Sequence, residues 1–450
     1  TTDATTTLST DGIVWNNISI LNRSTTTLLS DITCSGAFFT QGTPSTLNGY
    51  NARITGSLST AGGSSGSLSG TTTIIFEGSN CSWISGTGTN RLPTIINSSG
   101  TMGLSGATIF NGGTLVYSAG TIEASTNVLT ITGNATLSLG SGNTWGNFSM
   151  PTTSVVTTFT SDVYFAGYFS NGGNNSSYTG LYNMYVGGNF SWANSTVNTS
   201  GNTLSFILNG TGTWSGAGTC SNNVTINTTG TTTFSASIAY RKGTLTYIAG
   251  TVITSGSTLR PSDCVLNTDG IDWDAITVTI SGTITLLSPL NVTTQFTNTG
   301  SLTLNGSFLY LSGILSLGGS LSVVGTTVLE FIGSSPSWIA GTGNLRLNTN
   351  INCSTFTLGP SGISNCNFQG GTLTYVSGAT ITSGSTLDTG TAGSTLDLDG
   401  MALDNCIARQ STQTLLSKLT ANTLIVCQTS SVAFAGAFGW EVGTFRNAGV

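Results

Sequence analysis

The residues of this chain that could do chemistry are few, and carboxylates form the densest groups among them. Asp269, Asp272 and Asp274 fall within the segment NTDGIDWD. A second group, in LDLDGMALD, consists of Asp397, Asp399 and Asp404. A pair of carboxylates can hydrolyse a glycosidic bond, and a cluster of them can bind calcium. Both kinds of site therefore have to be weighed against a purely structural role.

The sequence around these carboxylates favours a structural role. Asp11, Asp269 and Asp399 each precede a glycine in matching contexts, TDGIVW, TDGIDW and LDGMAL. An Asp-Gly pair suits a tight turn, because Asp bonds to nearby backbone and glycine supplies positive φ. We therefore interpret these residues as turn residues, with a cation site and a catalytic pair as the alternatives.

Other catalytic chemistries lack their components. The chain has no His, so Ser/His/Asp and Cys/His nucleophile arrangements and Cys/His zinc sites cannot be assembled. Its eight Cys form no CxxC pair, and no GxxxxGK[ST] phosphate loop occurs. We interpret the cysteines as buried thiols. The sequence thus predicts a protein that is not an enzyme, with no catalytic residues, no cofactor and no metal.

The composition is typical of a strand-rich protein. Only 6% of residues are charged and 37% are hydrophobic, with 61 Gly and abundant Thr, Ser and Asn. Apolar residues alternate with Thr and Ser, which is the pattern of half-buried strands, and no helical periodicity accompanies it. Lys and Arg number ten and are scattered, which argues against nucleic-acid binding. The absence of a long apolar run argues against membrane insertion.

A long internal repeat is the main organising feature. The motif Gly-Thr-Leu-x-Tyr occurs three times, and its tyrosines are Tyr117, Tyr247 and Tyr375, at steps of 130 and 128 residues. Three further markers agree on a period near 129: a first Trp series, a second Trp series ending in Leu, and a TLLS motif. Their members are Trp83, Trp214 and Trp338; Trp15, Trp145, Trp273 and Leu403; and Leu28, Leu286 and Leu415.

Within each repeat, short strands recur every 6 to 10 residues between glycine-rich turns. This predicts an all-β fold, a long parallel β-solenoid (β-helix) built from about 129-residue internal repeats, each of about six coils of roughly 20 residues. Separate β-sandwiches and β-propeller blades are the alternatives. Sandwiches would require linkers, and the strands are too short for four-stranded blades.

The sequence predicts two regions. Residues 1–430 are expected to form one continuous solenoid of about three and a half repeats. Residues 431–450, with more bulky apolar residues, are expected to form a C-terminal cap or the start of a further assembly segment. Trp192 and Trp440 stand outside the repeat register, and Phe434 and Phe438 lie with Trp440 in the C-terminal segment; these four aromatic residues are expected to contact a glycan or a partner.

Over residues 1–430, the chain resembles the repetitive Thr/Ser/Gly-rich β-helix fibre proteins of viruses, such as tail fibres or virion surface fibres, and bacterial surface adhesins. The segments that carry the resemblance are GTGTWSGAGTCSNNVTINTTGTTTF, GTLTYIAGTVITSGSTL and LNTDGIDWDAITV. It implies a non-catalytic structural or adhesive fibre at a virion or cell surface. A cell-surface adhesin, a polysaccharide-degrading spike and a Thr-array ice binder are the alternatives.

The resemblance also implies the partners. These would be other structural subunits of a fibre or virion, cell-surface glycans and further copies of the chain, with neither nucleic acid nor membrane insertion.

Overall fold

The chain is an all-β parallel solenoid in the computed structural model, as predicted. The described residues are 5–10, 12–21, 25–41, 44–62, 67–84, 88–105, 107–123, 127–172, 176–193, 204–235, 237–318, 322–339, 341–359, 366–377, 386–389, 393–408, 412–427, 433–435 and 440–447. They contain no helix, and hence none long and apolar enough to cross a membrane.

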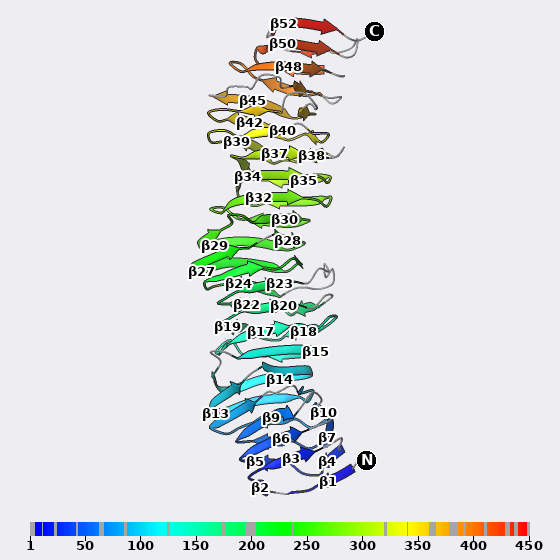
Figure 1. Ribbon diagram of the computed structural model, residues 1–450, viewed down its shortest axis with the longest axis vertical. Coiled ribbons are helices and arrows are strands. Elements are labelled where there is room, and N and C mark those ends of the chain that lie inside the picture. The colour runs from blue at the N-terminus through cyan, green and yellow to red at the C-terminus, as the bar shows by residue number, and fades with distance from the viewer. Residues whose placement is uncertain are drawn as a thin grey trace. The chain divides into compact units, whose positions relative to one another are not determined.

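The chain divides into two compact units. Residues 1–233 and 248–253 make up unit 1, and residues 234–247 and 254–450 make up unit 2. Figure 1 labels the strands of both units.

Part of unit 1 is built from coils of three short strands, whereas β13 (Thr94–Ser105), β14 (Ala107–Glu123) and β15 (Val128–Ser138) are longer. One coil consists of β5 (Ile32–Cys34), β6 (Ala37–Gln41) and β7 (Ser45–Gly49), and the next of β8 (Ala52–Ile54), β9 (Ser57–Gly62) and β10 (Leu68–Gly70). Each strand pairs in parallel with its counterpart in the next coil: β5 with β8, β6 with β9, and β7 with β10. The stacking is visible in Figure 1. Each strand therefore stacks on the equivalent strand of the preceding coil.

Unit 2 repeats this plan. Its strands β35 (Leu302–Gly306), β36 (Leu309–Leu311) and β37 (Ile314–Leu317) pair in parallel with β38 (Ser322–Val324), β39 (Val328–Phe331) and β40 (Ser337–Ile339). Paired residues lie 20 to 23 positions apart, as in Leu309 with Leu329 and Ile314 with Ser337. The prediction of about 20 residues per coil is confirmed.

The core of each unit consists of inward side chains stacked from coil to coil. Alternation along a strand sends every second residue inward, so that β5, β8 and β11 (Ile74–Phe76) share the pattern buried, half-buried, buried. An aromatic column in unit 1 joins Phe148, Phe169 and Phe190, whose ring centroids lie 5.5 and 5.2 Å apart. Each apolar side chain is thus covered from both neighbouring coils.

Asn side chains fasten one coil to the next. In each case the Oδ1 atom accepts a hydrogen bond from a backbone N–H one coil later. The pairs are Asn17 with Ala37, Asn48 with Thr71, Asn147 with Tyr168, Asn189 with Thr213, Asn305 with Thr326, and Asn348 with Thr372. These bonds satisfy corner N–H groups that the strand ladders leave over. They give the abundant Asn a structural role.

The marker residues of the repeat have matching local surroundings but do not share one face of the coils. In unit 2, Tyr247 lies in β29 (Thr244–Ile253) and Tyr375 in β45 (Thr372–Ser377), which belong to different sheets. The rings of Tyr117, Tyr247 and Tyr375 each pack against a positive-φ glycine about one coil later. A Cβ atom on these glycines, Gly140, Gly270 and Gly400, would lie 2.8, 3.2 and 3.4 Å from the ring. The marker tryptophans Trp83, Trp145, Trp214, Trp273 and Trp338 are all buried, whereas Trp15, in the first described coil, is 40% exposed.

Parallel pairing extends beyond the boundary expected at residue 430. Strand β51 (Ala433–Ala435) pairs with β49 (Thr412–Leu415), and β52 (Trp440–Asn447) pairs with β50 (Leu419–Cys427). The strand pattern at the C-terminal end is therefore the one seen in the rest of unit 2.

Candidate functional site

The two carboxylates of the strongest sequence candidate, Asp272 and Asp274, lie at the start of β32 (Asp272–Val278). One Asp274 oxygen accepts a hydrogen bond from the backbone N–H of Gly256 at 2.6 Å, and the other accepts one from the Thr294 hydroxyl. Asp272 accepts a hydrogen bond from the Asn291 side chain at 3.1 Å. All these partners lie one coil before or after β32. Both carboxylates therefore bridge neighbouring coils.

Asp269 and Asp399 lie in the turns that the sequence predicts. Backbone hydrogen bonds close these turns, from Ile271 N to Thr268 O at 3.0 Å and from Met401 N to Leu398 O at 2.9 Å. The glycine after each Asp has φ of +86° and +85°. Because only glycine adopts such values freely, the Asp-Gly pairs are accounted for by turn geometry. Asp11, the third predicted member, lies outside the described residues.

Each Asp-Gly turn is also held by a serine one coil later. The N–H groups of Asp269 and Asp399 donate to the hydroxyls of Ser288 and Ser417, both at 2.9 Å. These serines are the last residues of the TLLS motif. The sequence analysis used that motif only as a repeat marker, and it missed a fourth member, Ser161 of FTSD, which accepts from Gly140 N at 3.0 Å. The serine at the matching position of every copy was the sequence signal that could have revealed this contact.

Metal-ligating side chains do not gather in the described part of the chain. Across it, no three or more Cys, Asp or Glu residues come close enough together to hold an ion.

Seven cysteines have side chains that the structure describes, and all seven are buried. They are Cys34, Cys81, Cys220, Cys264, Cys353, Cys366 and Cys406. Burial raises the pKa of Cys220, Cys264 and Cys366 to about 12. A thiol with so high a pKa carries almost no thiolate at neutral pH, and the thiolate is the nucleophile. These cysteines therefore act as small apolar groups of the core.

One ion-pair ladder crosses three coils of unit 1. Arg53 donates to Asp31 at 3.0 Å and to Glu77 at 2.7 Å, and the three residues lie in successive coils. Burial acts to raise the pKa of Asp31, but hydrogen bonds from Asn51 and Arg53 outweigh it and lower that pKa. All three side chains are partly exposed, so the ladder adds a modest amount to stability.

The expectation that Trp192 is exposed was wrong. Its side chain is 2% exposed and packs against Phe169, Phe190 and Phe206, with its indole N–H donating to Thr219 O at 2.9 Å. A buried, hydrogen-bonded indole cannot stack on a glycan. The residue stands outside the repeat register because this aromatic column belongs to only one repeat.

The three C-terminal candidates fall where little is described. The backbones of Phe434 and Trp440 lie in β51 and β52, opposite Gln413 and Leu419. Their side chains and the whole of Phe438 lie outside the described residues, so their expected contact with a partner remains a prediction.

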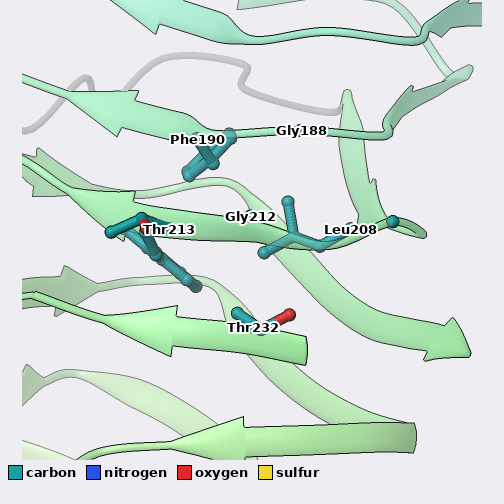
Figure 2. A pocket seen from close by; sticks show the side chains of 8 residues that line it. Gly188, Phe190, Leu208, Gly212, Thr213 and Thr232 are labelled. Atoms are coloured by element: carbon teal, nitrogen blue, oxygen red, sulfur yellow. The ribbon is translucent and has the colours of Figure 1, made fainter. Parts of the chain in front are cut away.

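Figure 2 shows a shallow hollow on unit 1 formed by β23 (Phe190–Trp192), β24 (Ser205–Leu208), β25 (Gly212–Ser215) and the start of the following coil. Its lining contains no titratable side chain. The residues are Gly188, Phe190, Leu208, Gly210, Gly212, Thr213, Trp214 and Thr232. Such a lining offers apolar contact and a few hydroxyl groups, and no acid or base for catalysis.

The comparisons with known proteins return no match: no family model, no curated protein and no solved structure is similar to this chain. The argument about function therefore depends on the residues and their geometry.

Proposed function

We propose that this chain is a non-catalytic structural or adhesive component of an extracellular fibre, such as the shaft of a virion surface fibre or tail fibre. One observation carries the proposal. Asp272 and Asp274 were the strongest candidates for a catalytic pair or a cation site. Both accept hydrogen bonds from groups of the neighbouring coils. Their contacts hold coils together.

Two further features support this function. Coils of parallel-paired strands recur in both units, so each unit is built by repeating one kind of coil. The chain is also nearly uncharged, with 6% charged residues, and presents hydroxyl and amide groups. Such a surface suits contact with sugars or with other neutral protein subunits. A cell-surface adhesin would use the same features.

Localisation tests the structural role. Antibodies raised against the purified chain should label filamentous projections of the native virion or cell in electron micrographs. Label confined to the interior of the particle or cell would contradict the proposal.

Catalysis is tested separately. The purified chain should release no reducing ends from surface polysaccharides, and the variants Asp272→Asn and Asp274→Asn should behave identically to it. Release of reducing ends that is lost in either variant would replace the structural function by that of a polysaccharide-degrading spike.

A further inference from the structure

Three basic side chains come together on two successive coils of unit 2. The ten Lys and Arg residues of the chain are scattered along the sequence, but strand pairing brings Arg241 and Lys242 close to Arg260. Arg241 is the last residue of β28 (Ser237–Arg241), Lys242 follows it, and Arg260 lies in β30 (Thr258–Ser262), which pairs in parallel with β28. Both strands are labelled in Figure 1. We call these three residues the basic patch.

The two arginines of the basic patch lie on the outer face of one sheet. Buried and half-buried residues alternate along β28 and along the start of β30, and both arginines are half-buried. Arg241 is opposite Ser262, and Arg260 is opposite Ala239. The arginines are therefore diagonal neighbours, with Cα atoms about 8 Å apart from the spacing and rise of the strands. Two long cationic side chains at this separation can reach the same anion.

The charge of the basic patch is only partly compensated. One oxygen of Asp263 lies 3.6 Å from an Arg241 nitrogen, and the other accepts a hydrogen bond from the Thr283 N–H at 3.1 Å. Arg260 and Lys242 form no ion pair with any described residue. Two positive charges therefore remain in a protein whose net charge is −6.

Both arginines also bury a nitrogen that has no acceptor. The Nε atoms of Arg241 and Arg260 are buried, and no described residue accepts a hydrogen bond from them. Arg53 of unit 1 shows how this solenoid accommodates an arginine structurally, because its guanidinium group donates to Asp31 and Glu77. A buried donor of a charged group is costly to leave unpaired, so the two Nε atoms indicate an acceptor supplied by a ligand.

The corner that carries Lys242 has an unusual backbone. Among the described residues, three that are not glycine have positive φ, and two of them are Lys242, at +66°, and Asp263, at +47°. They lie one coil apart at the same corner, directly after the pair formed by Arg241 and Ser262. Glycine would adopt these angles without strain. Strained backbone of this kind accompanies ligand sites, and here it keeps charged side chains at the corner.

The chemistry of the basic patch selects an oxyanion. A guanidinium group binds a carboxylate or a sulfate through two parallel N–H···O bonds, and the ammonium group of Lys242 adds a point charge. We propose that the basic patch binds the carboxylate or sulfate groups of an acidic polysaccharide.

The outer positions of the same sheet favour a polysaccharide over a nucleic acid. They carry half-buried hydroxyl and amide side chains, at Ser237, Thr258, Thr277, Gln295 and Thr297. Such groups form hydrogen bonds with sugar hydroxyls, whereas a nucleic acid needs a longer series of cations to follow its phosphates. The inference does not rest on the fibre function, because the three cations and their geometry carry it alone.

Substitutions that keep the side-chain length test the basic patch. A patch variant carries Lys242→Gln and Arg260→Gln, and it keeps Arg241, which has an ion pair of its own. A control variant carries Arg91→Gln and Arg346→Gln, at exposed residues away from the patch, so that the net charge changes by the same amount. Arg260→Lys keeps the charge and removes the fork of the guanidinium group.

Calorimetric titration of the full chain at low salt tests the inference with polygalacturonate, which carries carboxylates, dextran sulfate, which carries sulfates, and dextran, which carries neither. The unchanged chain and the control variant should bind one or both acidic polymers and not dextran, and binding of only one identifies the acid group. The patch variant should bind at least about tenfold more weakly, because it loses two charged donors, and Arg260→Lys should fall between. The acidic polymer should also raise the melting temperature of the unchanged chain more than that of the patch variant.

The inference is overturned if the unchanged chain binds neither acidic polymer, or if the patch variant, with unchanged circular dichroism, binds like the control. Tighter binding of DNA than of either polymer would overturn it in favour of a nucleic acid. A patch variant that fails to fold is replaced by Lys242→Gln alone, at an exposed side chain, which should still weaken binding; binding equal to the control would again overturn the inference. Electron microscopy locates the chain, whereas titration measures what it binds, so failure of this inference and failure of the fibre function are distinguishable.

Discussion

At the scale of single residues, polar side chains in this protein connect one coil to the next. Asp274 receives hydrogen bonds from Gly256 and Thr294, on opposite sides of its own coil. Arg53 does the same with Asp31 and Glu77. The carboxylates therefore replace hydrogen bonds that water would otherwise make to corner N–H groups.

Removing the acceptor at Asp274 should cost stability. Asp274→Ala leaves the Gly256 N–H without its partner, so the free energy of unfolding should fall by about 1–3 kcal/mol. Asp274→Asn keeps one side-chain oxygen and should lose clearly less. Denaturant unfolding of the two variants measures the difference. Equal losses in both variants would mean that the charge, and not the hydrogen bond, is what stabilises the corner.

The cysteine thiols should not react with thiol reagents in the folded protein. Because the pKa values of Cys220, Cys264 and Cys366 are about 12, these groups stay protonated at pH 8. We expect a colorimetric thiol reagent to label at most one of the eight cysteines in the native chain, since seven are buried, and all eight in denaturant. Fast native labelling of several thiols would contradict their burial.

Single residues were the least predictable from sequence. The Asp-Gly turns were predicted correctly because their chemistry is local. Trp192 was not, because exposure depends on which side chains other strands bring against a residue, here Phe169 from the preceding coil and Phe206 from the next strand of the same coil.

At the scale of elements, corners decide whether a coil can close. Gly306 combines positive φ with a backbone oxygen 2.1 Å from where its Cβ would be, whereas Gly256 has φ of +74° with open space around it. Gly142 has open space and no positive φ. Substitutions at these three glycines therefore distinguish the effect of a steric clash from that of backbone strain.

Alanine at these glycines should destabilise the chain in a fixed order. Gly306→Ala should cost the most, since it adds a clash with Leu286 to the strain; Gly256→Ala should cost about 1 kcal/mol from strain alone; and Gly142→Ala should be close to neutral. Melting temperatures of the three variants test this order. A Gly142→Ala variant as unstable as Gly306→Ala would show that the corner geometry is not the cause.

At the scale of the whole molecule, the sequence predicted the architecture because one pattern is repeated. The parallel pairing and the coil length of about 20 residues follow from alternation and turn spacing. The equivalence of Tyr117, Tyr247 and Tyr375 followed from their spacing alone. The expected boundary at residue 430 rested on a change of composition, and composition does not reveal that β51 and β52 still pair in parallel.

Removing one full repeat should preserve the fold. Deleting residues 161–287 joins Thr160 to Ser288, which restores the local sequence of a normal repeat, so the shortened chain should unfold cooperatively with β-rich circular dichroism. Deleting residues 161–297 instead joins Thr160 to Asn298, removes ten residues more, and leaves one coil about half its length short. Because such a coil cannot close around the core, this chain should aggregate or melt at a much lower temperature. Equal behaviour of the two deletions would contradict the repeat.

The parallel pairing of successive coils has a mechanical consequence. Within a unit, the hydrogen bonds between coils run along the stacking direction, so a pull applied along that direction loads the coil boundaries one after another. A terminal coil should then detach while the next stays closed, and each step should release about one coil of chain, roughly 70 Å of extended backbone. A unit stretched in a force spectrometer would lengthen in small, regular increments, yielding progressively under load in place of a single rupture.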